Sequence, residues 1–416
     1  MSTKRSAAQR KRPRPTKHIP APARRPRGLS YAVRLRGTIA LLLVLCAALT
    51  AANIATEPRP NAVSALEGTA GTSGFELYTL ERDVTDDNAG KKKPDTIRGT
   101  NIADSGDGTV ILTAPRIQEY AALPTALAAV TINDDNSSSL EIIPLSGGPE
   151  AQVPLPGAGK VELLRAASKR FVGFAFSSTP PSQQHWKTLF VYDTEDPSTP
   201  PREIRGLDGK PVSVLDWAFV PNTFSLVVQN ESGTMFLADA LAAANPAPLG
   251  LHAEFHGFVP GTRKIYVVDA SSDPTNKVAK NSTIDLTNGT ASPLDLKPVS
   301  RNDRSWPGAT VLLNESGRYT QSTSENTAGK VTSVLTVTDA TGSKTLYQPD
   351  PVWSRIDGYC PSPDGKFIAV EATAPEGAAD RYPVLPAHSP MRTEIIELDT
   401  GRHVRSLPGF LPSWCR

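Results

Sequence analysis

Short β-prone runs recur along this chain in a fixed order, and this repetition constrains the fold more than any other feature. Each unit has an apolar strand, a proline-containing turn, a strongly apolar strand, a polar turn and a third strand that ends in Asp. One unit covers 214–240, the next begins at 253 and a later one at 356. Pro221 and Pro260 hold the same place in two units, about 40 residues apart, a period typical of repeat architectures.

Repeats of this length predict an all-β fold, a six- or seven-bladed β-propeller. A single four-stranded sheet cannot bury both of its faces, and stacking in a ring supplies the missing contacts. Five units can be recognised between 161 and 409, and 75–155 has room for one or two more. Residues 409–414 resemble the opening strand of a further blade, whose other strands would come from near Phe75 and close the ring. A pair of β-sandwiches is the alternative.

The apolar runs themselves are predicted as strands, because they are rich in β-branched and aromatic residues and are bounded by turn residues. The chain also contains 38 proline residues, which favours turns over long helices. The predicted strands are 109–114, 170–176, 188–193, 224–229, 264–269, 333–339, 366–372 and 393–399.

Two motifs in the last unit carry a family resemblance. Residues 360–369 read CPSPDGKFIA, and residues 396–401 read IELDTG. The first closely resembles the blade signature of the TolB-like β-propellers, a WD-repeat-like family, and the second is similar to their outer strand and turn. The match is close in this last blade and loose over 75–416. It implies a bacterial propeller, membrane-anchored or secreted, that presents a face or central channel to a protein or peptide partner.

A hydrophobic run near the N-terminus predicts a membrane location. Residues 37–55 carry no charge and would form a helix of about 28 Å, close to the ~30 Å hydrocarbon thickness. Twelve Lys and Arg and no acid precede the run, so the N-terminus is expected to be cytoplasmic and the main domain extracytoplasmic. The predicted parts are a disordered basic cytoplasmic tail (1–36), a transmembrane helix or signal-anchor (37–55), a linker (56–74) and an extracytoplasmic β-propeller (75–416).

Cleavage of the hydrophobic run is an alternative to a single-pass anchor in the cell membrane. Residues 39–49 are short enough for the apolar part of a signal peptide, and Thr50, Ala51 and Ala52 offer small residues for cleavage. The basic region is unusually long for a signal peptide, which favours the retained anchor. Cleavage would instead give a secreted protein.

The charge of the main domain bears on its partners. Beyond residue 36, 32 Lys and Arg face 42 Asp and Glu, which gives a net charge of −10. This acidic balance argues against nucleic acid as a partner of the main domain. We expect an envelope protein or peptide partner, membrane attachment through one N-terminal helix, and a monomer.

The cysteines predict one disulfide. Cys46 lies in the hydrophobic run, Cys360 lies in the opening strand of the last full blade, and Cys415 follows Trp414 in the same strand of the next blade. Equivalent strands of neighbouring blades lie side by side, and an oxidising compartment permits a bond between them. We therefore predict a Cys360–Cys415 disulfide, with two free thiols as the alternative.

Motifs for catalysis are weak. The chain has no GxSxG nucleophile elbow. His252, Glu254 and His256 would share one face of a strand, but zinc usually needs a further ligand and supporting hydrogen bonds. We predict no catalytic, cofactor-binding or metal site and no cofactor.

The expected function is therefore that of a non-enzymatic, envelope-exposed scaffold that binds a protein or peptide partner. The alternative is a propeller enzyme or a carbohydrate-binding protein that uses loops at the channel mouth.

Overall fold

The structure is a computed structural model, and the part of the chain that it describes is entirely β. The chain divides into two compact units, Met1–Pro58 and Arg59–Arg416, and every described residue belongs to the second. Strands are the only regular elements in these residues, and none of them forms a helix able to span a bilayer. The predicted tail, hydrophobic helix and linker lie outside the described ranges. Those ranges are 76–82, 93–167, 170–178, 187–241, 245–269, 280–296, 305–327, 329–379, 382 and 388–414.

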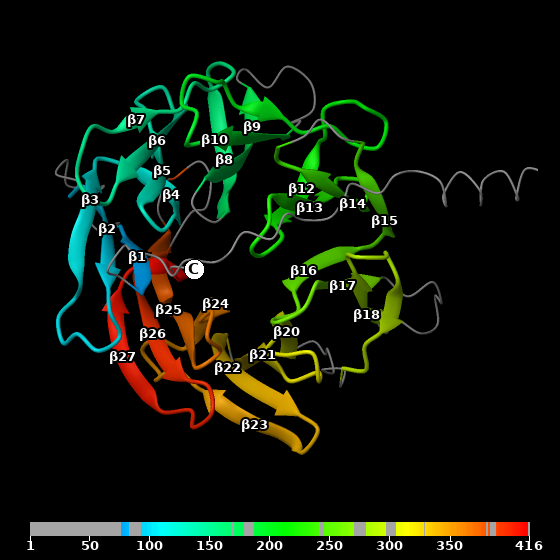
Figure 1. The fold of residues 1–416 in the computed structure, drawn as a ribbon. Coiled ribbons are helices and arrows are strands. Elements are labelled where there is room, and N and C mark those ends of the chain that lie inside the picture. The colour runs from blue at the N-terminus through cyan, green and yellow to red at the C-terminus, as the bar shows by residue number, and fades with distance from the viewer. Residues whose placement is uncertain are drawn as a thin grey trace, which may run out of the picture. The chain divides into compact units, whose positions relative to one another are not determined.

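The strands form seven four-stranded antiparallel sheets arranged around one axis (Figure 1). Each sheet is a blade, and its strands are named in order from the innermost to the outermost. Blade 1 consists of β28 (Phe410–Trp414), β1 (Leu77–Glu81), β2 (Asp95–Thr100) and β3 (Thr109–Ala114). Blade 2 consists of β4 (Ile117–Ala122), β5 (Ala126–Ile132), β6 (Ser138–Pro144) and β7 (Ala151–Gln152). Blade 3 consists of β8 (Gly159–Ala167), β9 (Phe171–Ser178), β10 (Thr188–Asp193) and β11 (Arg202–Glu203).

The remaining four blades follow in chain order. Blade 4 consists of β12 (Val214–Phe219), β13 (Ser225–Asn230), β14 (Thr234–Asp239) and β15 (Ala247–Leu251). Blade 5 consists of β16 (Glu254–Phe258), β17 (Lys264–Asp269), β18 (Lys280–Asp285) and β19 (Ala291–Pro293). Blade 6 consists of β20 (Ser305–Leu312), β21 (Tyr319–Thr327), β22 (Lys330–Asp339) and β23 (Gly342–Tyr347). Blade 7 consists of β24 (Arg355–Pro361), β25 (Phe367–Ala379), β26 (His388–Glu397) and β27 (His403–Pro408).

The predicted propeller is confirmed, and the number of blades is seven. The five units recognised in the sequence are blades 3 to 7, and the region before them contributes to two more. Every predicted strand is present, but β25 and β26 are longer than predicted. Their pairing resumes beyond an irregularity, where Ala378 lies opposite Ser389 and Ala379 lies opposite His388.

The last strand closes the ring, as predicted. β28 pairs antiparallel with β1, placing Trp414 opposite Leu77 and Phe410 opposite Leu80. Side chains of both neighbouring blades fasten it: the Thr393 hydroxyl donates to the Gly409 carbonyl (3.0 Å), and the Tyr120 hydroxyl donates to the Leu411 carbonyl (2.6 Å). Blade 1 therefore joins strands from the two ends of the domain.

The core lies mainly between blades, where the face of one sheet packs on the next. Trp217 of blade 4 is fully buried in a cluster that also contains Phe171 and Leu189 of blade 3. A Cβ atom at Gly173 of blade 3 would lie 2.3 Å from the Trp217 ring, so the close approach of these two blades requires glycine. Inter-blade packing of this kind is what makes a ring stable where a single blade is not.

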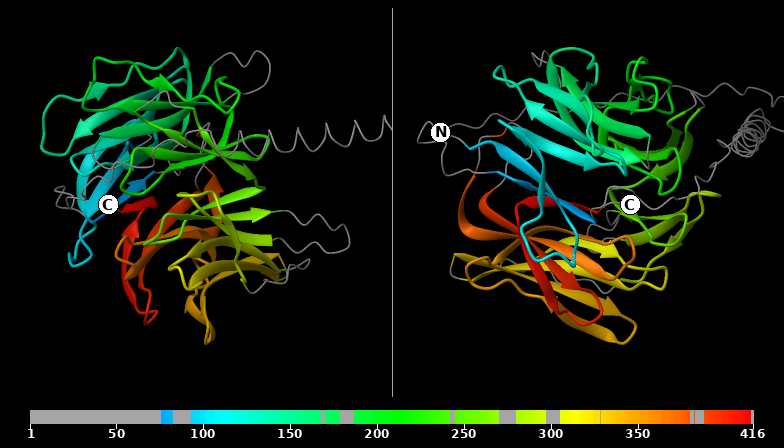
Figure 2. Two further views of the ribbon diagram at one scale, coloured as in Figure 1. Left: turned by 45° about the vertical axis from the view of Figure 1, so that its right-hand side comes forward. Right: turned by 60° about the vertical axis from the view of Figure 1, so that its left-hand side comes forward.

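Strand direction gives the ring two different faces (Figures 1 and 2). Strands alternate in direction within each blade, so connections between the first and second strands and between the third and fourth strands emerge on one face. We call this the turn face. Connections between the second and third strands, and those from one blade to the next, emerge on the other, which we call the crossover face.

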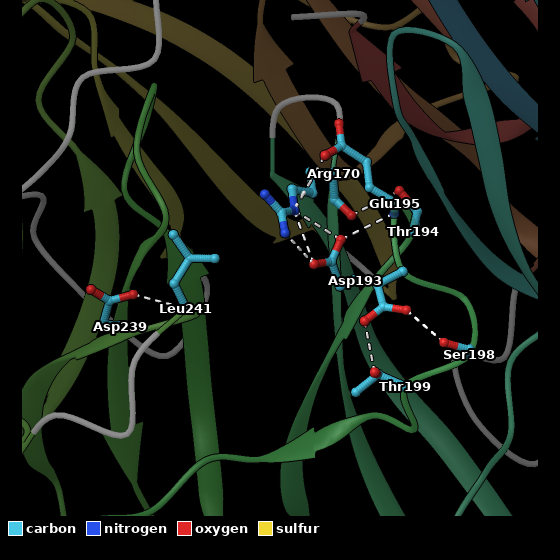
Figure 3. Close-up of polar contacts among 9 residues, drawn as sticks. Arg170, Asp193, Thr194, Glu195, Ser198, Thr199, Asp239 and Leu241 are labelled. Atoms are coloured by element: carbon cyan, nitrogen blue, oxygen red, sulfur yellow. Dashed lines mark hydrogen bonds and ion pairs between the residues drawn. The ribbon is translucent and has the colours of Figure 1, made fainter.

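The repeated sequence motifs lie on the turn face. The Asp that ends the third strand accepts a hydrogen bond from the N–H two residues later in blades 3, 4, 5 and 6, at 3.0, 2.7, 2.8 and 2.8 Å respectively. These residues are Asp193, Asp239, Asp285 and Asp339. In blade 3 the guanidinium group of Arg170, from the adjacent turn, binds the Asp193 carboxylate at 2.6 and 2.9 Å (Figure 3). The motif therefore stabilises turns.

Candidate partner-binding face

All seven innermost strands are irregular where they pair with the second strand. Each pairing has a shift in register, between Ile117 and Glu119 in blade 2, for example, and between Ile356 and Gly358 in blade 7. The other five blades show the same interruption. A bulge bends the strand and re-aims its side chains, and such bulges are common beside binding sites.

Exposed and charged side chains gather where three innermost strands begin, at the crossover face. We call these residues the inner rim: Leu215 and Asp216 of β12, Glu254 and His256 of β16, and Arg355 and Asp357 of β24. The side chain of Glu254 is 65% exposed and accepts a 2.8 Å hydrogen bond from His256. Arg355 pairs with Asp357 at 2.5 Å, so the rim combines an exposed apolar side chain, a hydrogen-bonded Glu–His pair and an ion pair.

The inner rim is not uniformly open. The side chain of Asp357 is only 19% exposed, because Arg355 and the Thr373 hydroxyl both bind its carboxylate. Asp216 is paired with Arg165 of the neighbouring blade at 3.2 Å. Gln118 and Glu119 of β4, the innermost strand of blade 2, are buried, so this strand adds no exposed side chain at these two positions.

Exposed apolar side chains also favour the crossover face. Leu207 (46%), Leu215 (50%), Leu251 (70%) and Val352 (66%) all lie in, or next to, connections between blades. Of the large apolar residues exposed in the described part of the chain, only Val110 and Leu241 lie elsewhere. Single exposed apolar residues are common, but the presence of four of the six on the crossover face distinguishes it from the turn face.

The histidines weighed as metal ligands have separate partners. The Nδ1 atom of His252 lies 2.9 Å from Asp269, while His256 pairs with Glu254 and packs against the ring of Tyr266. No group of three or more His, Cys, Asp or Glu side chains within the described ranges is arranged to hold a metal.

One polar cluster in blade 7 contains the residue types of a catalytic triad. Glu394, which is buried, lies 2.5 Å from Nε2 of His403 and accepts a 2.6 Å hydrogen bond from Ser406. Ser406 lies 3.2 Å from that same Nε2 atom. A triad needs the acid on one ring nitrogen and the nucleophile on the other, so this arrangement is structural.

Two buried acids hold bulged backbone of the innermost strands. Glu371 accepts a 2.6 Å hydrogen bond from the N–H of Leu411, and Glu119 accepts one of 3.2 Å from the N–H of Leu164. Burial raises the pKa of each to about 7, although these hydrogen bonds lower it. Leu411 itself has a φ of +50°, an uncommon conformation that the surrounding contacts must maintain.

Cys360 lies on the innermost strand of blade 7, as predicted, near the turn-face end of β24. The indole N–H of Trp414 donates to the Cys360 carbonyl at 3.1 Å, which brings the end of β28 beside it. Cys415 lies outside the described residues, so the disulfide stays a prediction. The sequence marks only Glu254 and His256 of the inner rim, as polar side chains on one face of a strand; the strand order brings them to the same rim as Leu215, Asp216, Arg355 and Asp357.

Comparison with known proteins adds information on the fold. No protein-family model matches the chain, and no curated protein matches its sequence. A prolyl endopeptidase structure has a TM-score of 0.54 at 12% identity, covering 88% of this chain and 54% of that chain. At this identity the likeness is one of fold. TolB from Acinetobacter baumannii matches with a TM-score of 0.42 and 13% identity, over 82% of this chain and 66% of that one.

Another solved propeller is also similar. The β-propeller domain of the trilobed protease from Pyrococcus furiosus has a TM-score of 0.49 at 11% identity, over 79% of this chain and 94% of that domain. The chain spans only about half of the endopeptidase, at 54%. A likeness at 12% identity shows the fold and assigns no chemistry.

Proposed function

We propose that this propeller is a non-enzymatic, envelope-exposed scaffold that binds a protein or peptide partner through its crossover face. The observation that carries the proposal is the difference in residue content between the two faces. Repeated turn motifs occupy one face, whereas the inner rim and four exposed apolar side chains occupy the other. A partner that contacted Leu215 would bury an apolar group next to charged side chains, and protein interfaces commonly combine the two.

The proposed location is the outer side of a cell membrane, with residues 37–55 as the anchor. The supporting features are the uncharged run itself and the twelve basic residues before it. The crossover face would then meet partners in the envelope. Secretion after cleavage of the run would leave the binding face unchanged.

Two leucines offer a matched test of the binding face. Leu215 is 50% exposed on the crossover face, and Leu241 is 51% exposed on the turn face. A photo-crosslinking amino acid would replace each leucine in turn in the full chain, expressed in the cells that make it. We expect a discrete cross-linked band from position 215 and none from position 241. Equal cross-linking from both positions, or none from 215, would contradict the proposal.

A variant of the same face supplies the second test. Glu254→Lys reverses an exposed charge of the inner rim, whereas Glu315→Lys reverses one on the turn face, where Glu315 pairs with Lys264. We expect the first substitution to remove the cross-link formed from position 215 and the second to leave it. Hydrolytic or lyase activity that is lost in Glu254→Lys would favour the enzymatic alternative.

A further inference from the structure

A tyrosine that belongs to blade 7 is buried at the crossover end of blade 1. Tyr382 lies in the connection between β25 and β26, beyond Ala379 and His388, the last pair that joins these strands in the described ranges. Only 6% of Tyr382 is exposed, and its hydroxyl donates a hydrogen bond to the Asp95 carboxylate of β2, 287 residues away in the sequence. Because Tyr382 lies beyond the β25–β26 ladder, contacts of its side chain with another blade hold it in place.

The ring of Tyr382 packs on the guanidinium group of Arg82, the residue that follows β1. The Cζ atom of Arg82 lies 3.9 Å from the centre of the Tyr382 ring and 4.9 Å from that of Phe410, the first residue of β28. Arg116, in the connection from blade 1 to blade 2, places a second guanidinium group 5.3 Å from the Tyr382 ring. A cation over an aromatic ring is attracted to it, more strongly where water is excluded. The contact between Tyr382 and Arg82 therefore lies against the ring closure, where β28 meets β1.

The groups that receive Tyr382 are themselves held by blade 2. The Nε atom of Arg82 donates to the Ile117 carbonyl at 2.9 Å, and its Nη2 atom donates to the Gln118 carbonyl. The Asp95 oxygen that accepts from Tyr382 also accepts a 2.8 Å hydrogen bond from the Ile117 N–H. These bonds to β4 do not involve the tyrosine, so they would keep the guanidinium and carboxylate groups in position without it.

We propose that Tyr382 is a clasp that joins blade 7 to blades 1 and 2 across the ring closure, and that its seat, formed by Arg82, Asp95 and Arg116, binds a phenol group. The seat offers a carboxylate to the hydroxyl group and guanidinium groups to the ring. Strand pairing already holds β28 to β1, and the clasp adds a lock at the crossover end of the same blade. Local opening of blade 1 then requires Tyr382 to leave its seat. The clasp does not depend on partner binding at the inner rim.

Hydrogen exchange of the purified full chain in detergent, followed by mass spectrometry, tests the clasp. Tyr382→Ala removes the ring and the hydroxyl group together. We expect the amides of β1 and β28 to exchange roughly tenfold faster than in the wild-type chain, whereas those of β13 in blade 4 keep their rate. Equal acceleration in all blades, or none in β1 and β28, would overturn the proposal.

Two further variants separate a specific clasp from a general loss of packing. Tyr382→Phe keeps the ring on Arg82 and loses the hydrogen bond to Asp95, so we expect a smaller acceleration in the same strands; it also serves as the test if Tyr382→Ala does not fold. Tyr266→Ala is the matched control, since Tyr266 is 3% exposed and its hydroxyl donates to Asn281 of the same blade at 2.8 Å. Faster exchange of β1 and β28 in this control would contradict a specific clasp.

Chemical rescue tests the seat. A cavity left by a large-to-small substitution can bind a small molecule of matching shape. p-Cresol, which carries the ring and the hydroxyl group of tyrosine, should return the exchange of β1 and β28 in Tyr382→Ala toward the wild-type rate and leave the wild-type chain unchanged. Toluene at the same free concentration should restore less, because it cannot donate a hydrogen bond to Asp95. No rescue by p-cresol, or equal rescue by toluene, would refute the phenol site.

Discussion

The two faces of the propeller differ in how they relate to the repeat. On the turn face, blades 3 to 6 use the same device, an Asp that caps the turn after the third strand. On the crossover face the same bond from a side-chain oxygen to the N–H two residues later occurs at Asp135, Asp208, Asn230 and Asp350, but in connections of different kinds. Four of the six exposed large apolar residues of the described ranges lie on this face. A motif that repeats at one place in the blade therefore indicates where the fold is stabilised, and the exposed apolar residues mark the surface proposed for binding.

The largest expected effect on stability comes from the predicted disulfide, which lies near the ring closure on the turn face. If Cys360 and Cys415 form the predicted disulfide, it closes a loop of about 55 residues and contributes about 4 kcal/mol in the chain-entropy model. Cys360→Ser should lower the free energy of unfolding by about that amount without altering partner binding. Chemical denaturation measures the difference.

Reduction of the wild-type protein should reproduce the loss caused by Cys360→Ser, and Cys46→Ser should cause none. Alkylation of both Cys360 and Cys415 in the unreduced wild-type protein would show that the bond is absent.

The next effect concerns a buried acid that belongs to neither face. Glu371 has a pKa of about 7 against an ordinary 4.5, so between these values the folded protein keeps a proton that the unfolded chain has released. Stability therefore falls as pH rises through this window, by about 3 kcal/mol for this group. Glu371→Gln keeps an acceptor for the Leu411 N–H and removes the titration.

The stability gain of Glu371→Gln over wild type should therefore grow by about 3 kcal/mol between pH 4.5 and pH 7.5. Urea denaturation at several pH values measures it. A difference that does not change with pH would show that Glu371 is ionised in the folded protein throughout this range.

A smaller effect is expected from the turn motif itself. Asp193→Ala removes the acceptor of the Arg170 pair and of the Glu195 N–H, and should cost about 1 to 2 kcal/mol of stability. Asp208→Ala on the crossover face removes the acceptor of the Lys210 N–H (3.0 Å) from a carboxylate that is 63% exposed and has no guanidinium partner, and should cost less, about 0.5 kcal/mol. Thermal unfolding of both variants compares the two positions; equal losses would mean that the Arg170 pair adds nothing to the turn.

The smallest stability effect should accompany the largest binding effect. Leu215→Asn and Leu241→Asn change leucines of almost equal exposure, so each should shift stability by about 0.5 kcal/mol or less. Leu215→Asn alone should reduce the amount of partner recovered by chemical cross-linking and affinity purification. A matching loss in Leu241→Asn would remove the distinction between the faces.

The sequence predicted the fold well because strand runs and turns are local signals. The runs at 109–114, 188–193 and 264–269 coincide with β3, β10 and β17, and ring closure by 409–414 followed from the incomplete blade at each end. β25 extends past its predicted end because a bulge lets pairing resume, and no local pattern marks that bulge.

The face proposed for binding was harder to predict because it forms only when the blades assemble. Leu215, Glu254 and Arg355 lie in three different blades. They come to surround the same axis only because the strand order makes β12, β16 and β24 the innermost strands. The raised pKa of Glu119 likewise has no signal in the sequence, since Gln-Glu on a strand is ordinary until the next blade covers it.

The position of β28 has a consequence for how the protein is made. β1 needs β28 on its inner side, yet more than 300 residues separate them and every other blade is synthesised in between. During synthesis the inner edge of β1 is therefore open, and contacts this distant in sequence form slowly. A chain emerging on the far side of a membrane would hold that edge exposed until its final strand arrives. Completion of translation would thus be the step that protects the nascent chain from association with its neighbours.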